Sequence, residues 1–352
     1  MDTKMDSKMD VNKILKPKPK YHSIGDEDIR IIDGKTNGLM NFNTTKHREF
    51  VGIYKKMRAR TWFPEQVNIA KDKVNFSLLK PEEQRTYELL LSQLIASDSI
   101  QANTLADDIN QYITSPVVNA CIIEQASQEC VHANSYAIMA EEIVPSVTKE
   151  RIYVNHINNI CLDSINRIFS HEYRIHNEPT IDSILHNIIT SQALEGILFP
   201  CSFAFFLGIE DKMTGTSEMI KEIYKDEILS HVPLFGMIYN TIMEEYNLDR
   251  NKYRNIFERK LFDLSLSIKE WLEYATDGSI SIEDIDQLVF YRAKSTVSWL
   301  FDGKDLSDDE VPINKYITLL KLALKGGEFM SKTNFFEANA TEYSRGAIKQ
   351  DY

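Results

Sequence analysis

Residues 123–136 read IEQASQECVHANSY, and this stretch decides how the rest of the chain must be arranged. On an α-helix it places Glu129, His132 and Tyr136 on one face, at spacings of three and four residues. Residues that a helix normally turns toward a core share that face; they are Ile122, Ala126, Ala133 and Ala140. A carboxylate on such a face needs a partner, because burying an ionised group alone is costly. The stretch therefore predicts a buried helix with polar partners on neighbouring elements.

The composition favours a helical protein. The chain has 352 residues, of which 43% are apolar and 26% charged, and it contains only 13 glycines and 10 prolines. Leu, Ile, Glu, Lys and Ala dominate its long segments, as is typical of an all-α fold. The formal net charge of -12 argues against a nucleic-acid-binding protein, whose affinity would rest on clustered Lys and Arg.

The cysteines and the terminal segment predict a cytoplasmic protein. The four cysteines lie in apolar helical contexts without a Cys-x-x-Cys motif, which is typical of reduced thiols. Residues 1–23 are charged throughout and lack the apolar core of a signal peptide, so we expect a mobile leader. The most apolar window, residues 197–209, is too short to span a membrane and contains Pro200. We expect a buried core helix there.

Start and stop signals divide the chain into helices. We expect irregular structure up to about residue 80, and a first helix that begins at Pro81. Breaks at residues 114–116, 177–180 and 214–216 separate the helices that follow. The further helices are expected at about 116–144, 148–172, from 180, after 216, and at 254–276, 282–300 and 313–325. From Phe335 the sequence has no periodicity, which predicts a flexible tail.

Four of these helices carry an acid inside an otherwise apolar stripe. One buried acid is more often a structural pair than a ligand, but no comparable set of inward Lys or Arg is available to neutralise these. A di-iron or di-manganese site in a helical bundle has this arrangement. Two helices each supply one carboxylate, and two other helices each supply a Glu and a His. The candidate ligands are Asp98, Glu129, His132, Glu195, Glu227 and His231.

Tyr136 is the aromatic residue that this site singles out. It lies one turn beyond His132, so it approaches the metals, and a tyrosine beside a redox metal can be oxidised. Alone, such a tyrosine would more often be a core residue. The sequence contains no Gly-rich phosphate loop and no Gly-x-Ser-x-Gly, which removes two other enzyme classes.

Several segments in order resemble the radical-generating small subunit of class I ribonucleotide reductase. They are TWFPEQVNIAKDK, SDSIQ, ECVHANSY, ALEGILFPCSFAF, KDE and FFEANATEYSRGAI, and they cover most of the chain from about Thr61. The resemblance implies a ferritin-like all-α homodimer. It also implies that an oxygen-activated dimetal centre makes a tyrosyl radical, which is passed to a separate catalytic subunit that reduces ribonucleotides to deoxyribonucleotides.

The resemblance assigns roles by position. The six candidate ligands would hold the metals, and Tyr136 would carry the radical, with a hydrogen bond to Asp98 as one option. Its pocket would be lined by Phe199, Phe203 and Ile223. Trp62, Asp226 and His132 would form the inner part of the radical-transfer route, with Asp226 orienting the histidine. Tyr343 would relay the radical near the partner subunit.

One departure from the family pattern concerns the second Glu and His pair. The family usually has Glu-x-x-His, but KDEILSH puts four steps between Glu227 and His231, with Ser230 at the expected place. Pro233 cannot donate a backbone hydrogen bond, so the helix is distorted beside the histidine. We expect a π-bulge around residues 229–230 that returns His231 to the metal.

The sequence predicts three regions and leaves several alternatives open. The regions are a leader and irregular arm (1–60), a ferritin-like dimetal domain (61–330) and a tail that docks on the large subunit (331–352). The centre could hold dinuclear iron (Fe–O–Fe) or dinuclear manganese activated by O2, with or without a flavodoxin-like activator or a ferredoxin-type reductant. Tyr352 competes with Tyr343 as the relay. The alternative function is a ferritin-like oxidase or an iron-storage protein that acts without a large subunit.

Overall fold

The computed structural model describes residues 10–21, 28–43, 46–172, 175, 179–304 and 306–325. Across these residues the regular structure is helical and contains no strand, which confirms the all-α prediction. The α-helices are α1 (Glu49–Ala59), α2 (Ala70–Phe76), α3 (Pro81–Asn103), α4 (Pro116–Glu142), α5 (Ser146–Asn158), α6 (Ile160–Glu172), α7 (Ile181–Ala193), α8 (Phe199–Gly208), α9 (Thr214–Asp226), α10 (Val232–Glu245), α11 (Arg250–Ala275), α12 (Ile282–Val297) and α13 (Lys315–Lys325). Short 3-10 turns are η1 (Pro64–Gln66), η3 (Asn110–Tyr112) and η7 (Asp308–Glu310). Segments of π-helix are η2 (Thr104–Ile109), η4 (Leu194–Leu198), η5 (Glu227–His231) and η6 (Ser298–Asp302).

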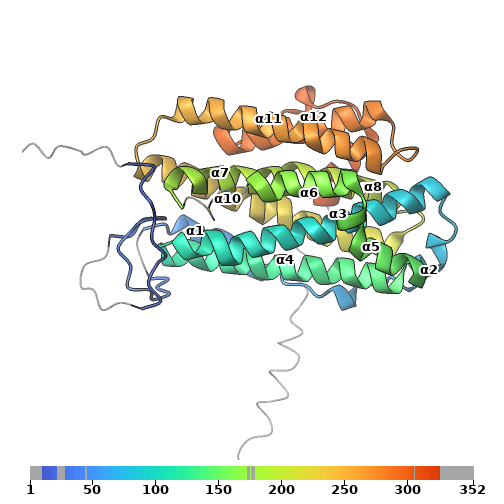
Figure 1. The fold of residues 1–352 in the computed structure, drawn as a ribbon, viewed down its shortest axis with the longest axis horizontal. Helices are drawn as coiled ribbons and strands as arrows, with labels where there is room; N and C mark the ends of the chain where they lie inside the picture. The colour runs from blue at the N-terminus through green and yellow to red at the C-terminus, as the bar shows by residue number, and fades with distance from the viewer. Residues whose placement is uncertain are drawn as a thin grey trace, which may run out of the picture.

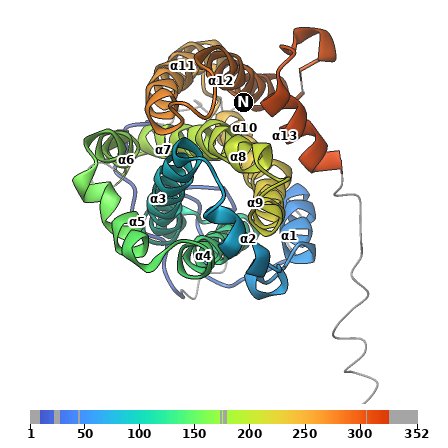
Figure 2. The same cartoon turned by 90° about the vertical axis from the view of Figure 1, so that its right-hand side faces the viewer.

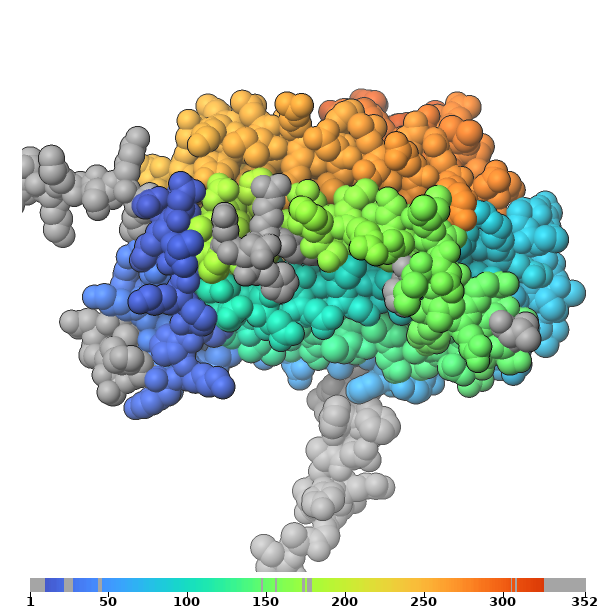
Figure 3. Space-filling model, viewed as in Figure 1, coloured from blue at the N-terminus to red at the C-terminus, as the bar shows by residue number. Residues whose placement is uncertain are grey.

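The long helices form a bundle whose axes run close to one direction (Figure 1). Seen along that direction, α3, α4 and α9 lie below α7 and α8, and the pair α11 and α12 covers the opposite side (Figure 2). Residues 10–21 and 28–43 lie over one end of the bundle, where they appear dark blue (Figure 3). Backbone hydrogen bonds from Leu15 to Pro179 (2.6 Å) and from Lys18 to Gln111 (2.8 Å) fix this arm.

The helices begin where the sequence provides capping groups. Proline occupies the first turn of both α3 and α4, where its missing N–H has no helical partner to lose. The Glu83 carboxylate accepts the Lys80 N–H at 2.9 Å, and Thr180 Oγ1 accepts the Ser183 N–H at 3.1 Å. Local sequence therefore sets the start of each of these helices.

The region before residue 80 is more regular than expected. Helix α1 buries Phe50, Ile53 and Met57, whose spacing of three and four residues is that of an amphipathic helix. In the short helix α2, Asp72 accepts hydrogen bonds from the N–H groups of Gly215 (3.3 Å) and Thr216 (2.6 Å). This distant carboxylate caps α9, so α2 is held by a tertiary contact.

The helix expected at 148–172 is divided into α5 and α6. Asn159 adopts an extended conformation, and its side chain accepts hydrogen bonds from the N–H groups of Cys161 and Leu162, both at 3.1 Å. Asparagine favours such a capping position over a helix interior. It therefore starts a new helix inside an apparently continuous pattern.

The most apolar stretch of the described chain lies in the middle of the bundle. The continuous helical run Ile181–Gly208 is long and apolar enough to cross a membrane, but its apolar window is 100% buried inside the fold. The expected core helix at 197–209 is thus buried from Ile197 to Leu207. The tail from residue 326 and the first nine residues of the leader lie outside the described residues.

Candidate metal centre

The structure brings all six candidate ligands together at the centre of the bundle. Helix α3 supplies Asp98, α4 supplies Glu129 and His132, η4 supplies Glu195, and η5 supplies Glu227 and His231. All of them are fully buried. Their potential ligand atoms form two groups within which every atom lies within 4.8 Å of the others. The groups are Glu129, Glu195, Glu227 and His231, and Asp98, Glu129 and His132.

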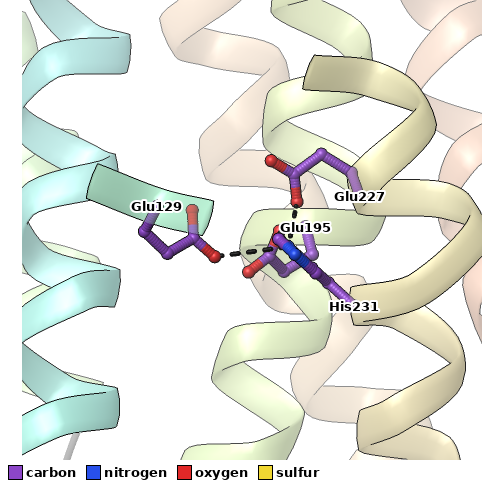
Figure 4. Close-up of side chains that lie close together, drawn as sticks. All are labelled: Glu129, Glu195, Glu227 and His231. Atoms are coloured by element: carbon purple, nitrogen blue, oxygen red, sulfur yellow. Dashed lines mark hydrogen bonds and ion pairs between the residues drawn. The ribbon is translucent and has the colours of Figure 1, made fainter. Parts of the chain in front are cut away.

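The side chains of the larger group converge from opposite sides (Figure 4). Glu129 extends from α4 toward Glu195, and the residues of η5 reach in from the other side. Glu129 belongs to both groups, so the two groups share a carboxylate. A shared carboxylate between two overlapping ligand sets is the arrangement expected of a dinuclear centre.

Both imidazoles point the same ring nitrogen at the carboxylates. His132 Nδ1 lies 3.1 Å from Glu227 Oε1 and 3.3 Å from Glu129 Oε2. His231 Nδ1 lies 2.9 Å from Glu227 Oε2 and 3.3 Å from Glu129 Oε1. Glu129 and Glu227 each reach both histidines with their two oxygens. These two glutamates are therefore placed to bridge a metal pair.

The other ring nitrogen of each histidine has its own partner. His132 Nε2 lies 3.3 Å from Asp226 Oδ2, as expected from the sequence, and His231 Nε2 lies 3.1 Å from Gln128 Oε1. The amide nitrogen of Gln128 in turn donates to the Met57 carbonyl of α1 at 3.5 Å. Such partners fix the ring orientation and leave Nδ1 free to bind a metal.

His231 reaches the site through the expected irregularity of the helix. Residues Glu227–His231 form the π-helical segment η5, and α10 then begins with Pro233 in its first turn. The extra residue rotates His231 onto the face of Glu227. The Ser230 hydroxyl is buried without a hydrogen-bond partner.

Two buried glutamines hold the Glu195 carboxylate. The side-chain amides of Gln101 and Gln125 donate to Glu195 Oε1 at 2.7 and 2.9 Å. Gln125 also lies 3.3 Å from Glu129 Oε1. With Oε1 occupied in this way, Glu195 presents Oε2 to the site, 3.4 Å from His231 Nδ1.

The proton affinities of the cluster reflect its burial and mutual contacts. Burial lowers the basicity of an imidazole, but the surrounding carboxylates outweigh it, so the pKa of His231 rises to about 10 and that of His132 lies well above its usual range. Burial would raise the pKa of Glu129, yet the two histidines lower it to about 2. Burial and the charge of Glu129 raise the pKa of Asp98. Without a metal, the protons stay on the two imidazoles.

The donor set fits two divalent cations. Both Asp98 oxygens are buried and lack a hydrogen-bond partner, which is costly for a carboxylate unless a cation is bound. Four carboxylates would balance the charge of two divalent ions. Carboxylates with imidazoles, and no thiolate in either group, suit iron or manganese.

Tyr136 lies beside this cluster on α4. Its ring is fully buried, and its hydroxyl has no partner that meets hydrogen-bond distance and angle, so the optional bond to Asp98 stays a prediction. Burial, with Asp98 as the largest charge contribution, raises the pKa of the phenol well above its usual range. Phe199, Phe203 and Ile223 are also fully buried, and their place in the tyrosine pocket stays a prediction.

Trp62 connects the cluster to the outer part of the bundle. Its indole Nε1 donates to Asp226 Oδ2 at 2.8 Å, and the side chain is only 9% exposed. Arg60 Nε donates to the other oxygen, Asp226 Oδ1, at 2.7 Å. Asp226 thus joins Trp62, Arg60 and His132. Tyr343 and Tyr352 lie outside the described residues.

The sequence reasoning missed Arg60 and the glutamines. Gln125 and Gln128 stand in the decisive stretch itself, four residues and one residue before Glu129, so their helical position was available. Gln101 follows Asp98 by three residues and was available in the same way. Arg60 carried no comparable signal, because its contact depends on how α1 packs beside α9.

Comparison with known families shows a match over most of the chain. The family model described as "Ribonucleotide reductase, small chain" matches residues 39–300. A curated relative, the ribonucleoside-diphosphate reductase subunit beta of Treponema pallidum (strain Nichols), is 31% identical over 367 residues, covering 97% of this chain and 99% of that protein.

Two solved structures share the fold. The ribonucleotide reductase R2 subunit from Clostridium botulinum matches with a TM-score of 0.80 at 24% identity, covering 89% of this chain and 99% of the other. The dimanganese(II)-NrdF of Streptococcus sanguinis matches with a TM-score of 0.69 at 19% identity, covering 81% and 98%. At these identities the likeness shows the fold alone.

The irregular helix yields a first prediction. His231→Ala should weaken binding of one metal ion more than about 100-fold, because a direct ligand matters more than an outer contact. Ser230→Ala, the matched control, should bind both ions as the wild type does. Anaerobic calorimetric titration of the metal-free protein with Mn²⁺ measures both. The reverse order of effects would mean that the serine is the ligand.

A second prediction concerns pH. Because the pKa of His231 is about 10 in the metal-free protein and that of His132 is also raised, both imidazoles are protonated at neutral pH. Metal must displace these protons, so affinity should rise as the pH increases toward 10, with about two protons released per chain at pH 7. Titrations in buffers of different ionisation enthalpy report this release. An apparent enthalpy that is the same in every buffer would contradict it.

Proposed function

This chain belongs to the ribonucleotide reductase small-chain family, and we propose that its buried centre oxidises Tyr136 for use by a separate catalytic subunit. As a small subunit it is part of an oxidoreductase that converts ribonucleotides to deoxyribonucleotides. The observation that carries the proposal is the position of Tyr136. Its phenol is fully buried without a hydrogen bond, on the same face of α4 as Glu129 and His132.

We assign the metal ligands to the six converging side chains. Asp98, Glu129 and His132 would hold one ion, and Glu129, Glu195, Glu227 and His231 would hold the other. Two iron or manganese ions, after reaction with O2, would supply the oxidising equivalent. Metal analysis of the purified protein distinguishes iron from manganese.

The protein itself controls the proton of Tyr136. The raised pKa keeps the phenol protonated at rest, so oxidation has to remove a proton together with an electron. Asp98 is the carboxylate with the largest effect on the phenol and is the acceptor that we propose. Burial excludes water and other reductants from the oxidised ring, which gives it a long lifetime. Phe199, Phe203 and Ile223 are proposed to form that dry pocket.

The outward route would pass through hydrogen-bonded side chains. His132, Asp226 and Trp62 form a continuous series with separations of 3.3 and 2.8 Å. We propose that this series connects the centre to the surface that faces the catalytic subunit. Arg60 neutralises Asp226 and holds its second oxygen, so that Asp226 keeps one oxygen between the indole and the imidazole.

The proposed assembly includes partners outside this chain. A small subunit requires a large catalytic subunit, and we propose that residues 331–352 dock on it and that Tyr343 relays the radical. We also propose a homodimer in the cytoplasm, with a flavodoxin-like activator or a ferredoxin-type reductant as optional partners. The three-region division of the chain remains a proposal. A ferritin-like oxidase or storage protein would need neither a tail nor a relay, and the curated relatives favour the reductase.

Tyr136→Phe tests the function directly. The phenyl ring fills the same space and Tyr136 is not a ligand, so the variant should bind two metals per chain as the wild type does. It should show no stable tyrosyl signal in low-temperature electron paramagnetic resonance after maturation in air. The wild type, with the same metal content, is the control. An unchanged signal in the variant would place the radical on another residue.

The tail supplies a separate prediction. Deleting residues 335–352 should abolish association with the large subunit, because a terminal segment that orders on a partner supplies its anchoring contacts. Tyr343→Phe should retain association and the Tyr136 signal, but should reduce nucleotide reduction to background. Pull-down and turnover assays measure these effects, with Tyr352→Phe as the matched control. Normal turnover in Tyr343→Phe together with loss in Tyr352→Phe would transfer the relay to Tyr352.

A further inference from the structure

Helix α12 packs directly against the π-helical segment that carries Glu195. At the contact, Gly196 leaves no room for a side chain, because a Cβ atom there would lie 2.6 Å from Thr296 Oγ1 and 3.2 Å from its Cγ2. Real atoms do not approach so closely, so a larger residue would force the Thr296 side chain, or the two elements, to shift. Gly196 therefore permits the close packing of η4 and α12.

The backbone of the same residue has an unusual hydrogen-bond partner. In a regular α-helix the carbonyl of residue 196 would accept the N–H of residue 200, but residue 200 is proline and has no N–H. The guanidinium of Arg292, on α12, donates instead, with Nε 2.9 Å from the Gly196 oxygen. A side chain from a distant helix thus replaces a missing backbone bond.

Arg292 is an unusual residue for this position. It is only 6% exposed, and it forms no ion pair with any residue that the structure describes. A buried guanidinium without a carboxylate partner is expensive to maintain. Its contact with the carbonyl next to Glu195 is a specific interaction that offsets part of this cost.

We propose that Arg292, on α12, is a positioning residue that holds η4 through the Gly196 carbonyl, which the side-chain-free contact of Gly196 with Thr296 brings within reach, and thereby sets the Glu195 carboxylate at the metal centre. Gln101 and Gln125 hold the Glu195 carboxylate through its Oε1 atom. Arg292 of α12 holds the adjacent backbone through the Gly196 carbonyl. The inference rests on the proposed metal centre and adds a positioning residue, Arg292, on a helix that carries none of the six candidate ligands. It concerns the ion bound by the Glu195 and His231 group, and leaves the Asp98 and His132 group untouched.

The test introduces a steric clash at Gly196 and then removes it by shortening Thr296. Gly196→Ala should weaken one of two Mn²⁺ binding events roughly 10- to 100-fold, as is typical for residues that orient a ligand. Thr296→Ala alone should bind as the wild type does, because Thr296 Oγ1 has no hydrogen-bond partner. The double variant should recover wild-type affinity, since the nearest remaining atom, the Thr296 Cβ, lies at 3.5 Å, an ordinary contact distance. Anaerobic calorimetry of the metal-free protein gives the stoichiometry and both affinities.

Two further variants make the result specific. Gly236→Ala is the matched control, because its new Cβ would lie 3.8 Å from the nearest atoms, and it should leave both affinities unchanged. Arg292→Met should weaken the same single ion, and Arg292→Lys, which retains a donor, should recover part of that loss. If Gly196→Ala does not fold, Arg292→Met and Arg292→Lys test whether α12 positions Glu195. General destabilisation would lower the unfolding midpoint without selecting one ion.

The outcomes separate this inference from the proposed function. A wild-type protein that binds no metal would refute both. A wild-type protein that binds two ions, with wild-type binding in Gly196→Ala or Arg292→Met, would overturn the inference alone. Weakening in Gly196→Ala that Thr296→Ala does not relieve would also overturn it, because the contact with α12 would then not be the cause.

Discussion

Burial of like charge is the constraint on which this structure depends. Four carboxylates are fully buried within a small volume, and mutual repulsion with loss of hydration would drive them apart. The two imidazoles offset part of this charge as imidazolium ions, and two divalent metals would offset all of it with both imidazoles neutral. The bundle has to supply the remaining restraint mechanically. It does so by placing the acids on different helices that pack against one another.

The restraint is built mainly from neutral groups. Gln101, Gln125 and Gln128 contact ligand side chains through amides, so they orient charge without cancelling it. The guanidinium of Arg60 lies one step farther out, on Asp226. Had Arg60 faced a ligand directly, it would have competed with a metal for the same oxygen. The outward position of the cation keeps the inner carboxylates available.

Helical spacing predicted the centre because its residues obey local geometry. Glu129, His132 and Tyr136 share a face in any α-helix, and the four-residue step from Glu227 to His231, together with Pro233, indicated the π-helical turn that the structure contains. Spacing could not reveal contacts made by tertiary packing. Asp72 caps a helix more than a hundred residues away, and Arg60 meets Asp226 only because α1 lies beside η5. The apolar pattern around Asn159 is continuous and predicts one helix. The asparagine side chain instead caps the start of α6, so the structure has two helices there.

The π-helical segments η4 and η5 change the direction in which side chains point along two of the long helical runs. One additional residue rotates the helix that follows it by about 100° about its axis. The apolar stripe of α8 is therefore rotated relative to that of α7, and the apolar stripe of α10 relative to that of α9. In each pair the stripe before the offset and the stripe after it both face the core, and the ligands Glu195, Glu227 and His231 lie inside the offset. The core and the metal centre can therefore follow different registers along the same helix.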